Sequence, residues 1–157
     1  MNNFIYDTPT KVYFGKDEEL KIGKIISEYH PSKVLIHFGG ASARKSGLLE
    51  RVENCLKEEN ISFVELGGVV ANPELSLVRE GIAIGKREGV DFVLAVGGGS
   101  VLDSSKAIAN GLANPDVDVW DFSLGKAAPA RTLPKGAILT LAAACLLYTS
   151  DAADEED

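Results

Sequence analysis

The strongest constraint on the fold is an apolar run that ends in three consecutive glycines. Residues 92–96 are all apolar, which is typical of a buried strand, and a helical pattern runs from Val101 to about Leu112. The glycines and Ser100 lie between the two. A helix start offers free backbone N–H groups and the positive end of the helix dipole, and glycines admit a ligand close to the backbone. We therefore predict a phosphate or pyrophosphate site in preference to a mere tight connection.

The rest of the chain alternates expected strands with expected helices. Short aromatic and β-branched runs at 4–6 and 11–14 predict an N-terminal β-hairpin. Further strands are expected at 33–38, 61–66 and 137–141, helices at 17–29, 43–59, 72–88 and 101–112, and a loop over 114–135. This alternation predicts an α/β fold with a mainly parallel, Rossmann-like sheet and flanking helices. Ligands of such sheets bind at the carboxyl ends of the strands.

A second glycine turn follows the strand expected at 33–38. Gly39 and Gly40 lead to Ser42, Arg44 and Lys45. Where the cofactor is NAD, a carboxylate at the end of an early strand usually holds the adenosine ribose hydroxyls. A hydroxyl and two cations suit a 2′-phosphate better, so this turn favours NADP. The plainer interpretation is a capped helix start with solvated basic residues.

Charge and composition exclude several other classes of function. The last seven residues hold five acids and no base, so residues 1–150 carry only −2 of the formal net charge of −7. A nearly neutral body predicts no nucleic-acid partner and no membrane surface. Cys55 and Cys145 have the spacing of neither a disulfide framework nor a zinc site. With no signal peptide and no apolar run of about 18 residues, the chain is expected to be cytoplasmic.

The residues themselves reveal no catalytic centre. Asp103 follows Gly99 by one helical turn, where it either stabilises the helix start by its charge or accepts hydrogen bonds from a ligand. His30 and His37 have no metal-ligand spacing, and His37 is interpreted as structural. We therefore assign no catalytic residue and no metal ligand.

Residues 97–106, GGGSVLDSSK, resemble the signature loop of the iron-containing alcohol dehydrogenase family. The other motifs follow in the family's order: the aromatic hairpin, GGAS at 39–42, Asn72-Pro73, and the segments 118–122 and 138–141. The resemblance covers about residues 3–144 and is greatest to the butanol-dehydrogenase-like, NADP-preferring branch. It implies that the chain is a dehydroquinate-synthase-like N-terminal domain. The helical C-terminal domain, which binds the metal in this family, is expected to be missing here.

The resemblance also implies which residues bind the cofactor. The pyrophosphate would be held by Gly97, Gly98, Gly99 and Ser100, and the adenosine-ribose end by Gly39, Gly40, Ser42 and Asn72. Thr140 and Leu141 would line the cofactor cleft, and Asp103 would lie beside the nicotinamide half. The expected cofactor is NADP or NAD. Iron or zinc is expected only in the full-length parent, which would form a homodimer.

From residue 145 the sequence departs from the family pattern. Residues 1–144 are expected to form the dinucleotide-binding domain, and residues 145–157 a disordered or artefactual tail. The family's metal-binding residues have no counterpart here. The chain is therefore expected to be the cofactor-binding part, inactive alone, of an oxidoreductase that transfers a hydride between NADP(H) and a primary alcohol or aldehyde. The alternatives are a non-catalytic nucleotide- or phosphate-binding module, and a glycerol dehydrogenase, glycerol-phosphate dehydrogenase or dehydroquinate-synthase-like enzyme of the same superfamily.

Overall fold

The computed structural model describes residues 9–71 and 74–140. A four-stranded sheet in the order β2-β1-β3-β4 lies at its centre, and each neighbouring pair of strands is parallel. The strands are β1 (Val34–Phe38), β2 (Phe63–Leu66), β3 (Phe92–Gly97) and β4 (Lys135–Leu139). The expected α/β fold with a parallel sheet is confirmed.

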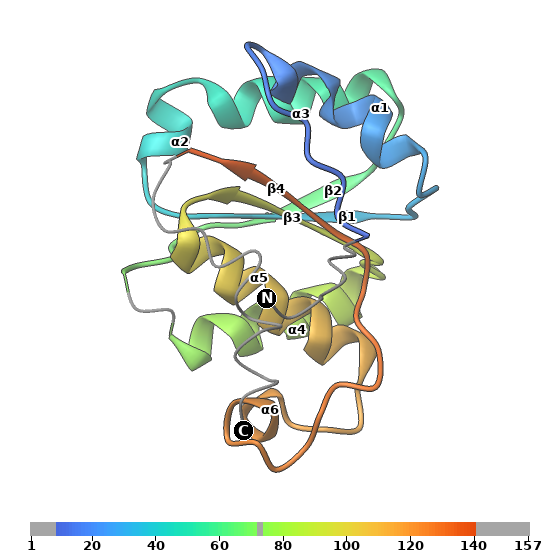
Figure 1. Cartoon of the computed structure of the whole chain (residues 1–157), viewed down its shortest axis with the longest axis vertical. Coiled ribbons are helices and arrows are strands. Elements are labelled where there is room, and N and C mark those ends of the chain that lie inside the picture. The colour runs from blue at the N-terminus through green and yellow to red at the C-terminus, as the bar shows by residue number, and fades with distance from the viewer. Residues whose placement is uncertain (1–8, 72–73, 141–157) are drawn as a thin grey trace, which may run out of the picture.

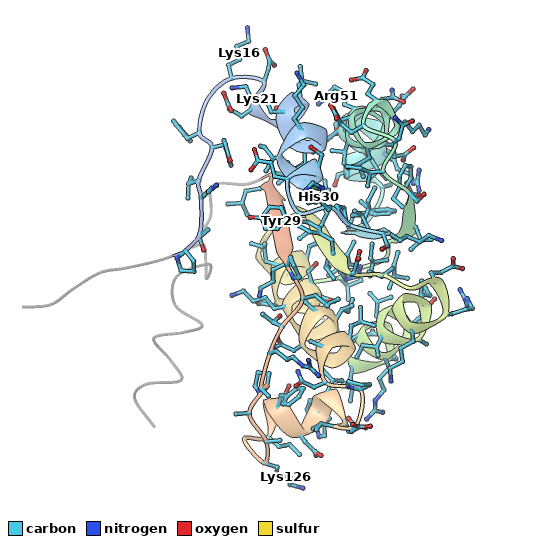
Figure 2. The ribbon with its side chains drawn as sticks, turned by 90° about the vertical axis from the view of Figure 1, so that its right-hand side faces the viewer. Lys16, Lys21, Tyr29, His30, Arg51 and Lys126 are labelled. Carbon is cyan, nitrogen blue, oxygen red and sulfur yellow. The ribbon has the colours of Figure 1, made fainter. Side chains whose placement is uncertain are left out.

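Helices cover both faces of this sheet (Figure 1). One face carries η1 (Glu18–Lys21), α1 (Ile22–Ser27), α2 (Ser42–Lys45) and α3 (Leu48–Glu58). The other carries α4 (Leu75–Glu88) and α5 (Gly99–Ala113), and the short α6 (Val119–Ser123) lies beyond them. Figure 2 shows the same layers from the side, with Lys21 and Arg51 in the outer layer at one end and Lys126 at the other.

The two central strands are buried on both faces. Every residue of β1 is buried, which explains why four of its five residues are apolar. Ile36 belongs to the core under α1 and α3, whereas Leu35 belongs to the core under α4 and α5. Alternate residues of one strand therefore tie the two helical layers to the same sheet.

The direction of winding reverses between β1 and β3. The chain leaves β1 through α2 and α3 on one face and pairs β2 on one side of β1. It then crosses through α4 on the opposite face and pairs β3 on the other side of β1. In an open α/β sheet a crevice forms outside the carboxyl ends of the strands at such a reversal.

Two expected elements differ from the sequence-based prediction. The helix expected over 43–59 is split into α2 and α3, because Gly47 adopts a left-handed φ of 75° that no continuous helix accommodates. The loop expected over 114–135 contains α6. Asp118 caps α6, since its side chain accepts a hydrogen bond from the Trp120 N–H at 2.9 Å.

The N-terminal hairpin is not seen in the described part of the chain. Residues 11–14 form no strand, so this arm of the prediction is wrong, and the arm at 4–6 lies outside the described residues. Phe14 is 98% exposed and Val12 is 65% exposed. These apolar side chains therefore pack on no face that would hold them in a strand. The expected tail at 145–157 also lies outside the described residues.

None of the helices within 9–71 and 74–140 combines the length and apolar character needed to cross a membrane.

Candidate functional site

The two glycine turns lie side by side at the carboxyl edge of the sheet. Phe38 is paired with Val96 at the ends of β1 and β3, and a glycine follows each of these residues. A Cβ placed on Gly39 would lie 3.7 Å from Cγ2 of Val101, in the first turn of α5. The turns are therefore neighbours at the point where the sheet reverses, and the Val101 side chain lies beside both of them.

The turn after β3 is shaped by close packing on one side and is open on the other. A Cβ on Gly97 would lie 2.6 Å from Cγ2 of Val101, so a larger residue there would displace α5. Gly98 is the N-cap of α5, and a Cβ on Gly98 or Gly99 would meet no atom within 4 Å. Open space beside a helix N-terminus allows a negatively charged group to approach the backbone.

Ser100 holds a neighbouring loop against this turn. Its hydroxyl donates to the Ala71 carbonyl oxygen at 2.9 Å and does not cap α5. The protein itself therefore satisfies the hydrogen of the Ser100 hydroxyl, while the oxygen keeps an acceptor position. Asn72, the expected ribose contact, follows Ala71 in the chain and lies outside the described residues.

Thr140 and Asp103 occupy different places around the same turn. The Thr140 N–H donates to the Gly97 carbonyl oxygen at 3.1 Å, which brings the end of β4 to the turn. Asp103 is an exposed residue of α5, one helical turn beyond Gly99. Leu141, expected beside Thr140, lies outside the described residues.

The turn after β1 carries its positive charge differently from the expectation. Gly40 has open space where a Cβ would stand, and Ser42 is the exposed first residue of α2. The Arg44 guanidinium forms an ion pair with Glu65 at 2.6 Å and lies 5.1 Å from the centre of the Phe38 ring. Arg44 is therefore engaged by a carboxylate of β2 that sequence reasoning did not connect with it.

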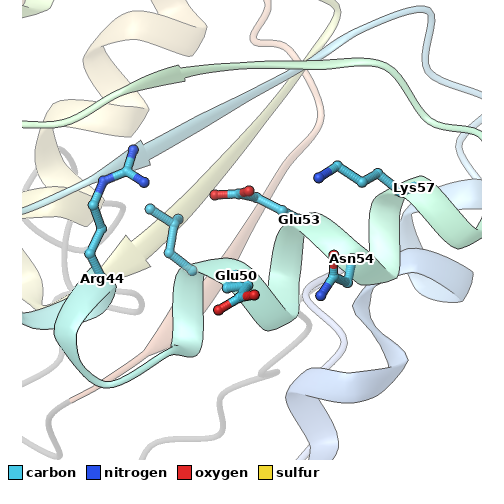
Figure 3. A pocket seen from close by; sticks show the side chains of 6 residues that line it. Arg44, Glu50, Glu53, Asn54 and Lys57 are labelled. Carbon is cyan, nitrogen blue, oxygen red and sulfur yellow. The ribbon is translucent and has the colours of Figure 1, made fainter.

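A surface hollow of about 350 Å³ adjoins Arg44 along α2 and α3, on the side of these helices that faces β2 (Figure 3). Arg44, Glu53 and Lys57 line it, together with Leu49, Glu50 and Asn54. A hydrogen bond to Glu65, with partial burial, raises the pKa of the Glu53 carboxyl. Two acids and two bases line this hollow, so it offers no excess of one charge to a ligand, and neither glycine turn lines it.

Beneath the glycine turns lies a buried hydrogen-bonded histidine. His37 is fully buried in β1 and bonds the Leu66 carbonyl oxygen through Nδ1 at 2.8 Å and the Ser104 hydroxyl through Nε2 at 2.7 Å. Burial lowers the pKa of the imidazole. The structural interpretation of His37 agrees with these contacts. Nothing in the sequence pointed to its partner, Ser104.

Over residues 9–71 and 74–140, no group of three His, Cys, Asp or Glu side chains is arranged to hold a metal ion. The described residues therefore do not form a metal centre.

The fold and the paired turns define an α/β domain of the doubly wound class, with glycine turns at its topological switch point. Residues 9–153 match the family model described as iron-containing alcohol dehydrogenase. The chain belongs to the iron-containing alcohol dehydrogenase family.

The relatives of the chain include enzymes with two different cofactors in their names. NADH-dependent butanol dehydrogenase A of Clostridium acetobutylicum is 46% identical over 143 residues. The NADPH-dependent aldehyde reductase YqhD of Escherichia coli is 37% identical over 145 residues. In each case the match covers 91% of this chain and 36% of the relative, so the chain spans about a third of the length of these proteins.

The solved structures that resemble this chain include the same two kinds of enzyme. NADH-dependent butanol dehydrogenase A from Thermotoga maritima superimposes with a TM-score of 0.87 at 43% identity. That match covers 91% of this chain and 36% of the Thermotoga chain. A cofactor-free form of YqhD from E. coli superimposes with a TM-score of 0.79 at 37% identity.

Proposed function

We propose that the chain is the dinucleotide-binding part of an alcohol dehydrogenase that transfers a hydride between NADP(H) and a primary alcohol or aldehyde. The observation that carries the proposal is that two glycine turns lie side by side at the switch point of the sheet. Gly40, Gly98 and Gly99 are open on their free sides, so one extended ligand has access to both turns. Relatives named as butanol dehydrogenases and an aldehyde reductase support the choice of substrate.

Within this proposal, the residues of the chain bind and orient the cofactor. The N-terminus of α5 would hold the pyrophosphate through backbone N–H groups, favoured by the helix dipole. Gly40 and Ser42 would lie at the adenosine-ribose end, and Thr140 would border the cleft beside Gly97. Reduction and oxidation are the chemistry of the bound nicotinamide.

The proposed preference for NADP depends on the end of β1. Gly39 stands where a carboxylate would favour the ribose diol of NAD, and Ser42 and Lys45 are exposed just beyond it. Arg44 lies in the same segment, but a 2′-phosphate would have to compete with Glu65 for its guanidinium. Glu65 thereby limits the contribution of Arg44 to the affinity for NADP.

Calorimetric titration of the 157-residue chain with NADP, NAD and inorganic phosphate tests this proposal. We expect NADP to bind more tightly than NAD, and phosphate to bind far more weakly than either. Equal affinity for phosphate and the dinucleotides would instead indicate a simple phosphate-binding module. Absence of dinucleotide binding would contradict the proposal.

Two substitutions test the cofactor preference separately. Gly39→Asp is expected to weaken NADP binding about tenfold by charge repulsion and to improve NAD binding. Glu65→Gln is expected to release Arg44 and strengthen NADP binding by up to about fivefold, the range of an exposed ion pair, with little change for NAD. If Gly39→Asp leaves the ratio of the two affinities unchanged, the assignment of this turn to the adenosine ribose is wrong.

We further propose that the 157-residue chain binds the cofactor without turning over substrate, since the family's metal-binding residues have no counterpart in its sequence. An assay of NADPH-dependent butyraldehyde reduction with added Fe²⁺ or Zn²⁺ should show no activity. Measurable reduction would overturn this statement while leaving the cofactor site intact.

A further inference from the structure

Two buried polar side chains connect the strand and the helix that carry the glycine turns. His37 is fully buried and stands two residues before Gly39, while Ser104 is 1% exposed and lies in the second turn of α5. They are 67 residues apart in the chain, yet Nε2 of His37 lies 2.7 Å from the Ser104 hydroxyl oxygen. Buried polar pairs are directional contacts inside an otherwise apolar core.

The contacts determine which imidazole nitrogen carries the proton. The Leu66 carbonyl oxygen only accepts, so Nδ1 of His37 must be protonated and donate to it at 2.8 Å. In a neutral ring Nε2 then has a free lone pair, which accepts the hydrogen of the Ser104 hydroxyl at 2.7 Å. Burial lowers the pKa of the ring and so favours this neutral form.

This chain of hydrogen bonds joins three segments at the carboxyl edge. Leu66 is the partner of His37 across β1 and β2, and Ser104 lies on α5. Val101, which fills the space beside Gly39 and Gly97, lies three residues before Ser104 and therefore on the same face of α5. A contact that fixes the position of Ser104 therefore also fixes the position of Val101 and of the α5 N-terminus relative to the Gly39 turn.

Apolar packing alone leaves this placement less constrained. α5 packs on the sheet largely through apolar residues such as Ile108 and Ala109, and such packing is not directional. A hydrogen bond that tolerates little change in length or angle resists rotation and sliding of the helix. The His37–Ser104 hydrogen bond therefore restricts movements of α5 that apolar packing alone would allow.

We propose that His37 is a positioning residue which, through Ser104, sets the distance between the two glycine turns. This inference rests on the proposed function, in which the turns hold different parts of one dinucleotide. His37 touches no ligand in this role, and acts only through α5.

Ser104→Ala and Ser105→Ala form a matched pair for the test. Both serines are buried neighbours on α5, and the Ser105 hydroxyl has no hydrogen-bond partner in the described part of the chain. Each substitution deletes one hydroxyl from the same helix, but only Ser104→Ala removes the contact with His37. We expect Ser104→Ala to weaken NADPH binding about fivefold and to shift the backbone amide resonances of residues 39–41 and 98–101. Ser105→Ala should change neither.

The imidazole of the wild-type chain gives an independent readout. In ¹⁵N-labelled, ligand-free protein, Nδ1 of His37 should be the protonated nitrogen and Nε2 the unprotonated one. In Ser104→Ala the Nε2 resonance should shift, since its hydrogen-bond donor is lost. The tautomer tests the two hydrogen bonds themselves, and the pair of serine variants tests whether these bonds position the glycine turns.

The outcomes separate the two proposals. If the wild-type chain binds neither NADPH nor NADH, the proposed function fails, and the amide and imidazole resonances still decide the positioning role. Protonation of Nε2 in the wild type would overturn the inference. Equal amide shifts in the Ser104→Ala and Ser105→Ala variants, with equal affinities where binding occurs, would also overturn the inference.

Discussion

At the scale of single residues, the neutral imidazole of His37 makes the stability of the fold depend on pH. Its pKa is lowered from the ordinary value of 6.5 by burial, and both of its hydrogen-bond partners are uncharged. Below pH 6.5 the unfolded chain binds a proton that the folded chain does not bind. Stability therefore falls as the pH drops below 6.5 and is fully retained above it.

Urea unfolding of the wild type and of His37→Asn should reveal this dependence. Asparagine keeps an N–H donor for the Leu66 carbonyl and does not titrate. Between pH 7.5 and 5.5, the wild type should lose up to about 1.4 kcal/mol more of its free energy of unfolding than the variant. Parallel losses in the two proteins would show that the His37 ring is not held neutral.

The residues of the site differ in how far the sequence could predict them. Gly97, Gly98, Gly99 and the turn at Gly39 were recognisable because their chemistry is local: a strand, a glycine turn and a helix in immediate succession. The bond between His37 and Ser104, and the pair formed by Arg44 and Glu65, join residues 67 and 21 positions apart. Such pairs depend on strand order and helix rotation, which local patterns do not encode.

At the scale of elements, glycines permit close packing of helices at two places. Gly23 of α1 faces α3, and a Cβ there would collide with the Cys55 carbonyl group, lying 2.8 Å from its carbon. Gly85 of α4 faces α5, and a Cβ there would lie 2.6 Å from the two terminal methyl carbons of Leu112. The first obstacle is backbone and the second is the end of a flexible side chain.

This difference predicts unequal effects of the same substitution. Alanine is favoured over glycine inside a helix by about 1 kcal/mol, a gain available at both sites. In Gly85→Ala the Leu112 side chain moves aside, so the free energy of unfolding should stay within about 0.5 kcal/mol of the wild type. Gly23→Ala must displace α1 from α3 and should cost about 2 kcal/mol. Denaturant titration measures both, and equal losses would contradict this account of the α1–α3 contact.

The elements themselves were largely predictable, with exceptions that have local causes. The buried strands were recognisable from largely apolar runs, of which residues 92–96 are the clearest. The break at Gly47 was missed because helical periodicity reports which residues are apolar. It does not reveal that one glycine between α2 and α3 adopts a left-handed backbone conformation. α6 was missed because the prolines around it favour a loop, although Asp118 before Val119 is an N-cap signal.

At the scale of the whole molecule, strand order brings the two glycine turns to the same edge of the sheet. β1 and β3 are neighbours although β2 lies between them in the sequence, and the helices change faces at the same point. Two segments separated by almost sixty residues thereby meet at one edge of the sheet. We propose that one nicotinamide dinucleotide spans this edge.

Amide NMR titration of the 157-residue chain with NADPH tests that claim most directly. We expect the amide resonances of residues 39–42 and 97–101 to shift together, with a single binding curve. Residues at the opposite edge, such as Lys33 and Asp91, which are hydrogen-bonded to each other, should not move. Shifts confined to the hollow lined by Glu50 and Asn54, or to only one of the two glycine turns, would contradict it.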